Sequence, residues 1–106
     1  IVEQPEDEIA AISMAIGASC VGVRSMTATS GGGLCLMVES LGLTGIAEVA
    51  LVIIDAQRPG PATGLATRTE QADLRFVIHA AQGEFPRVVM APGSAREAFY
   101  LTLKAV

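Results

Sequence analysis

The chain has 106 residues, of which 51% are hydrophobic and 17% charged. This composition can bury a core and excludes an intrinsically disordered chain, and the length suits one domain. The formal charge is −4, and without a Lys/Arg cluster the chain is a poor nucleic-acid binder, because phosphate contacts need cations. No apolar run reaches the ~18 residues that a membrane-spanning helix needs. Cys20 and Cys35 are too few for a disulfide framework and fit a reducing cytoplasm, and we expect both thiols to be buried.

The apolar periodicity alternates between strand and helix along the chain. Glycine and proline punctuation separates the segments, and Ser94 with Glu97 forms a capping-box pattern. The elements predicted in chain order are strand 1–4, helix 5–22, strand 25–30, a glycine turn 31–33, helix 34–43, strand 50–55, loop 57–71, helix 72–81, strand 86–90 and helix 95–106. We therefore predict an α/β fold: a three-layer parallel sheet with helices on both faces, its four strands ending at Gln4, Ser30, Asp55 and Met90.

Two charged side chains follow the carboxyl ends of predicted strands, where α/β proteins place ligands. Glu8 lies at the first strand-to-helix junction, and could hold or donate a proton there, or serve only as helix N-terminal electrostatics in solvent. Arg58 follows the strand ALVIID, and its guanidinium suits a carboxylate ligand or a loop salt bridge to Asp55 or Glu70. We expect Glu8, the turn Gly31–Gly33 and Arg58 to lie at the same edge of the sheet.

Other signals are weaker. The turn Gly31–Gly33 could cradle an anion, or could be a close-packed turn or an approach to a flat ligand, because no Gly-x-Gly-x-x-Gly or P-loop pattern is present. His79 is the only histidine, and a partly buried structural role is expected of it. There is no metal-ligand signature.

Four stretches together carry a family resemblance. They are Glu6 to Ala10 (EDEIA), Met26 to Gly31 (MTATSG), Val52 to Arg58 (VIIDAQR) and Gly60 to Asp73 (GPATGLATRTEQAD). The chain resembles, in order and over essentially its whole length, the α subunit of 2-oxoacid:ferredoxin oxidoreductases, and within that family the 2-oxoglutarate synthase type. The Gly-Pro-x-Thr-Gly-x-x-Thr loop followed by Glu-Gln-x-Asp is the most specific of these motifs.

The resemblance implies a thiamine diphosphate enzyme. It would carry out reversible oxidative decarboxylation of a 2-oxoacid, forming an acyl-coenzyme A and passing electrons to ferredoxin. Residues 1–106 would be a partial pyrimidine-binding domain of that cofactor, truncated at both ends relative to the family. The diphosphate–Mg²⁺ site and an iron–sulfur cluster are expected on a partner β subunit.

The same resemblance assigns roles to matched residues. Glu8, with Glu6 as the alternative, would hydrogen-bond the pyrimidine ring nitrogen and promote formation of the thiazolium ylid. The cofactor-binding residues would be Glu8, Thr29, Ser30, Gly31, Gly32 and Gly33. The substrate-binding residues would be Arg58, which would grip the substrate carboxylate, and Gly60, Thr63 and Gly64.

The sequence also departs from the family. Gly31-Gly32-Gly33 stands where Gly-Pro-Gly is usual, and Ala62 and Ala66 stand where Ser and Pro are frequent. A Tyr-Pro-Ile-Thr-Pro stretch, which precedes the first helix in the family, is not in the chain. We therefore expect the chain to act only as part of a heteromeric enzyme; a non-catalytic assembly module and an enzyme for pyruvate or branched-chain 2-oxoacids remain the alternatives.

Overall fold

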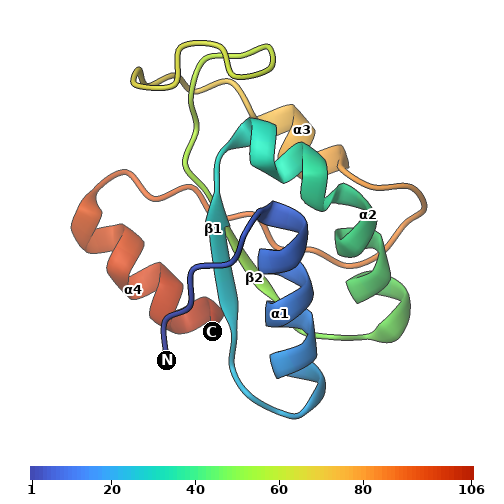
Figure 1. Ribbon diagram of the computed structural model, residues 1–106. Helices are drawn as coiled ribbons and strands as arrows, with labels where there is room; N and C mark the ends of the chain where they lie inside the picture. Colours follow the sequence, from blue (N-terminus) through green and yellow to red (C-terminus); the bar gives the residue numbers. More distant parts are fainter.

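A computed structural model describes residues 1–106 and shows helices packed around a small parallel sheet (Figure 1). The elements are α1 (Glu8–Cys20), β1 (Met26–Thr29), α2 (Gly31–Ala47), β2 (Val52–Asp55), α3 (Leu74–His79) and α4 (Ala95–Ala105). Figure 1 shows α1 and α2 on one side of the two strands and α4 on the other. The predicted α/β class is confirmed.

The sheet consists of β1 and β2, which pair in parallel with Met26 opposite Val52 and Thr29 opposite Asp55. One further backbone bond, from Ala56 N–H to the Thr29 carbonyl at 2.8 Å, continues the pairing past β2. Because parallel strands run the same way, the segments after β1 and β2 leave the sheet at one edge. The residues expected to form a site follow both strands at this edge.

Two of the four predicted strands are wrong. Residues 1–4 and 86–90 are not strands, and Ile1, Val2 and Val88 are 117%, 98% and 84% exposed. None of the backbone hydrogen bonds outside the helices and strands involves these two segments. A strand exists only with a hydrogen-bonded neighbour, and neither segment has one in the chain. Their apolar, β-type sequences were therefore not enough to predict strands.

The predicted glycine turn is also wrong, because Gly31, Gly32 and Gly33 form the first turn of α2. Three glycines in a row weaken a helix, which is why the pattern indicated a turn. Ser30, extended at φ −124°, is the N-cap residue, and the Leu34 N–H bonds its carbonyl at 2.8 Å. Contacts from other elements, described below, explain why glycine occupies this helical turn.

The core lies between α1, α2 and the sheet. Its fully buried centre is Ile12 and Met37, packed with Ile16 and Leu34. Small buried residues on both helices, among them Ala15, Ser40 and Thr44, let α1 and α2 approach closely.

The expectation of buried cysteines is wrong, since both thiols are exposed. Cys20 is the last residue of α1, beyond the part of the helix that α2 and the sheet cover. Cys35 lies next to the buried Leu34 on α2 but on the adjacent face, as the helical turn of 100° per residue dictates. His79, the last residue of α3, is likewise exposed rather than partly buried.

Helices α3 and α4 complete the chain. Helix α3 is shorter than the predicted 72–81, while α4 begins where Ser94 and Glu97 indicated. The Ser94 hydroxyl accepts the Glu97 N–H at 3.2 Å, and the Glu97 carboxylate accepts the Gly93 N–H at 2.8 Å, one residue before the position of a standard capping box. No helix of the structure has the length and apolar character needed to cross a membrane.

Candidate functional site

The first turn of α2 forms a surface without Cβ atoms at the carboxyl edge of the sheet. A Cβ added to Gly31 would lie 2.7 to 2.9 Å from the carboxyl group of Asp73. A Cβ on Gly32 would lie 3.5 Å from Nη2 of Arg58, and one on Gly33 would lie 2.8 Å from Cγ of Glu8. Side chains from α1, the loop after β2 and the start of α3 therefore converge on one helical turn, which glycine alone leaves open to them.

Glu8 is half-buried and lies against Gly33. Asp7, not Glu8, is the N-cap of α1, and its carboxylate accepts the Ala10 N–H at 2.8 Å. Glu8 is thereby free of the capping role, and its Oε1 lies 3.0 Å from the position of a Gly33 Cβ. Glu6, the alternative carboxylate, is exposed. Glu8 therefore faces the glycine turn instead of being fully solvated, although it also stands in the first turn of α1, where a negative charge suits the helix end.

Arg58 projects from the loop after β2 toward the same turn. Its Nε is buried without a hydrogen-bond partner, and both carboxyl oxygens of Asp55 are buried without one as well. The alternative of a salt bridge from Arg58 to Asp55 is therefore wrong. Glu70, the other suggested partner, lies in the exposed stretch 60–72.

A cavity of about 370 Å³ opens between the glycine surface and the loop. Its walls carry Arg58, Cys35 and Phe76, together with Gly31, Gly32, Gly60, Pro61, Ala62 and Asp73. The Ser30 side chain makes no capping hydrogen bond, so the first N–H groups of α2 have no side-chain acceptor. A cationic side chain, a carboxyl group and an uncapped helix start give this cavity the character of a site for a polar ligand.

Two aspartates lie at this edge of the sheet, and one of them, Asp73, is in the cavity wall. Asp55 is the last residue of β2, and Asp73 precedes α3. Burial of the Asp55 carboxyl, and to a smaller extent the neighbouring Asp73, raises its pKa to about 6. A nearby negative charge makes a carboxyl group hold its proton more tightly.

The structure thus brings together most of the residues predicted for a site. Glu8, Gly31–Gly33 and Arg58 lie at one edge, as expected, and Gly60 lines the cavity. Thr29 lies under the turn, with its Oγ1 against the Cβ position of Gly33. Thr63 and Gly64 lie further out in the exposed loop and do not line the cavity.

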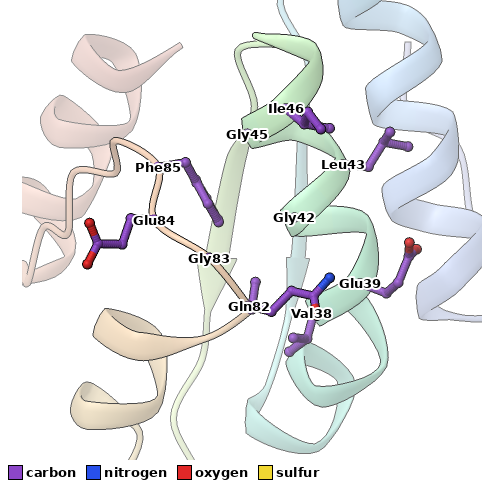
Figure 2. A pocket seen from close by; sticks show the side chains of 11 residues that line it. Val38, Glu39, Gly42, Leu43, Gly45, Ile46, Gln82, Gly83, Glu84 and Phe85 are labelled. Carbon is purple, nitrogen blue, oxygen red and sulfur yellow. The ribbon is translucent and has the colours of Figure 1, made fainter.

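A larger hollow, of about 800 Å³, lies away from this edge (Figure 2). It is formed by the second half of α2 and residues 81–85, and Figure 2 shows the Phe85 side chain directed toward α2. The Phe85 ring packs on Gly45, with Cδ1 2.9 Å from the position of a Gly45 Cβ. None of the predicted site residues lines it, so its size does not make it the functional site.

Sequence reasoning missed two contributors to the smaller cavity. Asp73 was placed inside a helix rather than at its N-cap, and Cys35 was expected to be buried. Asp55 was considered only as a partner of Arg58. The signal for both aspartates was present, since Asp55 ends an apolar strand and Asp73 stands just before a helix, which are ligand-facing positions at a carboxyl edge.

Fold and site together define an α/β protein with a ligand site at the carboxyl edge of a parallel sheet. A family model described as "Pyruvate flavodoxin/ferredoxin oxidoreductase, thiamine diP-bdg" matches residues 1–106. The chain belongs to this thiamine diphosphate-binding family.

Individual relatives agree with that assignment. The chain is 59% identical over 99 residues to the α subunit of 2-oxoacid:ferredoxin oxidoreductase 1 from Sulfurisphaera tokodaii, covering 93% of this chain and 16% of the relative. It is 48% identical over 103 residues to the 2-oxoglutarate oxidoreductase subunit KorA of Mycobacterium tuberculosis, covering 97% and 16%. The chain therefore spans about a sixth of the length of these relatives.

A solved structure shares the fold. It is the 2-oxoglutarate:ferredoxin oxidoreductase from Magnetococcus marinus, with 2-oxoglutarate, coenzyme A and succinyl-CoA bound, and it matches with a TM-score of 0.91 and 45% identity. The match covers 96% of this chain and 18% of that one. The resemblance read from the sequence is confirmed at the level of the family.

The glycine surface predicts opposite outcomes for two neighbouring substitutions. In Gly33→Ala the new Cβ would overlap Thr29 and Glu8, so we expect a loss of about 1–3 kcal/mol in the free energy of unfolding. In Gly32→Ala the Cβ meets only ordinary contacts at 3.5 Å, so we expect no loss, or a gain of about 0.4–1 kcal/mol from reduced freedom of the unfolded chain. Urea denaturation of both variants checks this, and equal losses would contradict the packing described.

Proposed function

We propose that this chain is the part of a 2-oxoacid:ferredoxin oxidoreductase α subunit that holds the pyrimidine half of thiamine diphosphate. The observation that best supports this proposal is that Glu8 and Arg58 both lie against the glycine turn of α2. A carboxylate and a guanidinium from separate elements converge there, beside a cavity, in a chain of the matching family.

The residues present fit such a cofactor. A flat ring needs a surface without Cβ atoms, and Gly32 in the cavity wall supplies one, while side chains of the chain itself lie against Gly31 and Gly33. A ring nitrogen that shares a proton needs a partly desolvated carboxyl group, and Glu8 is half-buried beside that surface. The chemistry that thiamine diphosphate supplies when bound is stabilisation of a carbanion at the carbonyl carbon of a 2-oxoacid.

This chain's own residues would bind and position. Glu8 would hold a proton with the pyrimidine ring nitrogen, which is a general acid–base role. Arg58 would pair its guanidinium with the carboxylate of the 2-oxoacid, a group whose two oxygens match the guanidinium fork. Thr29 and Ser30 would support the turn that faces the ring, and Gly60, Thr63 and Gly64 would line the approach of the substrate.

We further propose the setting of this site. The complete enzyme would convert a 2-oxoacid and coenzyme A into an acyl-coenzyme A, with ferredoxin as electron acceptor. A partner β subunit would carry the diphosphate–Mg²⁺ site and an iron–sulfur cluster. The named substrate of the M. marinus protein supports 2-oxoglutarate, and pyruvate or a branched-chain 2-oxoacid is the alternative. A reducing cytoplasm fits its two exposed thiols.

One observation weighs against a purely structural module. An assembly domain would have no need of a glutamate packed against a glycine turn at the ligand edge of the sheet. Glu8 occupies that position, and the capping function that would explain it otherwise belongs to Asp7.

Removing the proton-holding capacity of Glu8 should slow the reaction without unfolding the chain. In the complete α/β complex with saturating thiamine diphosphate, we expect Glu8→Gln to lower kcat by ~10²–10⁴-fold, because glutamine keeps the shape but cannot share a proton. Glu6→Gln, at an exposed position in the same segment, is the matched control and should retain activity. Steady-state kinetics checks both; near-normal kcat in Glu8→Gln would remove Glu8 from the role.

Arg58→Lys should act on binding more than on turnover. A point charge replaces a two-pronged donor, so we expect the KM for the 2-oxoacid to rise by roughly 10- to 100-fold with a smaller change in kcat. Arg68→Lys, in the exposed part of the same loop, should leave KM unchanged. An unchanged KM in Arg58→Lys would contradict carboxylate recognition by Arg58.

A further inference from the structure

The loop that carries Arg58 has a buried, unpartnered carboxyl group at each end. Asp55 ends β2, Asp73 precedes α3, and the intervening residues 56–72 contain Arg58. A hydrogen bond joins the two ends, since Gln57 Oε1 accepts the Asp73 N–H at 3.2 Å. From residue 60 to residue 72 the loop is exposed, so its position depends on how its ends are held.

The Asp73 carboxyl also anchors the loop to α2. Both of its oxygens lie within 2.8 Å of the position that a Gly31 Cβ would occupy. The end of the loop is therefore seated directly on the helical turn that we propose faces the cofactor.

The oxygens at this junction have no donor. Oδ1 and Oδ2 of Asp55 and Oδ2 of Asp73 are buried and make no hydrogen bond to a donor group. An ionised carboxylate only accepts hydrogen bonds, and leaving a buried charge without a partner is costly. Asp55 lies opposite Thr29 in the sheet, and Asp73 lies against Gly31, two residues further along, so the two carboxyl groups are neighbours. One can satisfy the other when one of them carries a proton.

We propose that Asp55 and Asp73 share one proton, and that this shared proton holds the loop 56–72 closed on the first turn of α2. No other charged group near Asp55 and Asp73 takes the place of the shared proton. Arg58 directs Nη2 toward Gly32 and its Nε is unpartnered, and Glu8 lies over Gly33. On α3, Arg75 and His79 are exposed, and β1 carries no charged residue.

The direction of the pH dependence follows from the pKa of Asp55. It is raised from 3.8 to about 6 in the closed loop, with burial as the largest cause. A raised pKa means that the proton stabilises the closed form fully below 3.8 and is lost as pH rises toward 6. Above that range the Asp55 carboxyl is ionised and is repelled by the charge of Asp73, so the loop opens more readily.

Hydrogen exchange at the two ends of the loop, at the hydrogen-bonded amides of Ala56 and Asp73, tests this in the complete complex without reference to catalysis. After correction for the intrinsic rate, we expect wild-type exchange to quicken by about tenfold per pH unit from pH ~5 to pH ~6 and then level off. In Asp55→Asn the amide donates to Asp73 at every pH, so exchange should be slow at pH 7 and independent of pH. Asp73→Asn should behave in the same way and serves as the second variant.

Segment 34–43 of α2 is the internal control and should show no such slope in any variant. A wild-type loop without the slope, or an Asp55→Asn loop that keeps it, would overturn the shared proton.

The consequence for substrate rests on the proposed function. If Arg58 binds the 2-oxoacid, its KM should rise with pH over the same range in the wild type and stay constant in Asp55→Asn. If KM changes neither with pH nor with Asp55→Asn, while hydrogen exchange gives the expected result, the role of Arg58 is contradicted and the shared proton is still supported.

Discussion

The first turn of α2 lacks Cβ atoms at three successive positions, and the arrangement of the site depends on this. Asp73 lies on Gly31, Arg58 approaches Gly32 and Glu8 lies on Gly33, so each glycine receives a side chain from a different element. An alanine at the first or third position would place a carbon atom where a carboxyl group now lies. Helix propensity disfavours this sequence, and the convergence of charged groups explains why glycine stands there.

The parallel pairing of β1 and β2 brings these elements to one place. This pairing directs the start of α2 and the loop after β2 to the same edge of the sheet. Helix α1 is held beside them by the core, where its Ile12 packs with Met37 of α2. The site therefore has one side formed by packed elements and one formed by the exposed start of the loop, Gly60, Pro61 and Ala62. Exposed loops at such an edge commonly carry binding residues.

The sequence was sufficient for the helices and the two central strands, because their apolar periodicity and caps are local signals. Residues 1–4 and 86–90 have the same apolar character as β2, yet strand formation depends on a neighbour that a pattern cannot show. Arg58 was placed at this edge correctly by its position after β2, whereas Glu8 was placed there from a strand 1–4 that does not form and from the family motif. Asp73 was misplaced because the predicted helix started too early. Cys35 was misplaced because it was assigned to the apolar face of its helix, although it lies about 100° from the buried Leu34.

The central claim is that Glu8 shares a proton with the ring of thiamine diphosphate at the glycine surface. The most direct test uses cofactor analogues in which one of the two pyrimidine ring nitrogens is replaced by carbon, assayed with wild-type and Glu8→Gln complexes. If the claim holds, one analogue lowers turnover of the wild type as far as Glu8→Gln does, and with that analogue the substitution costs nothing further. An additive loss with both analogues would show that Glu8 and the ring nitrogen act independently, and would contradict the account.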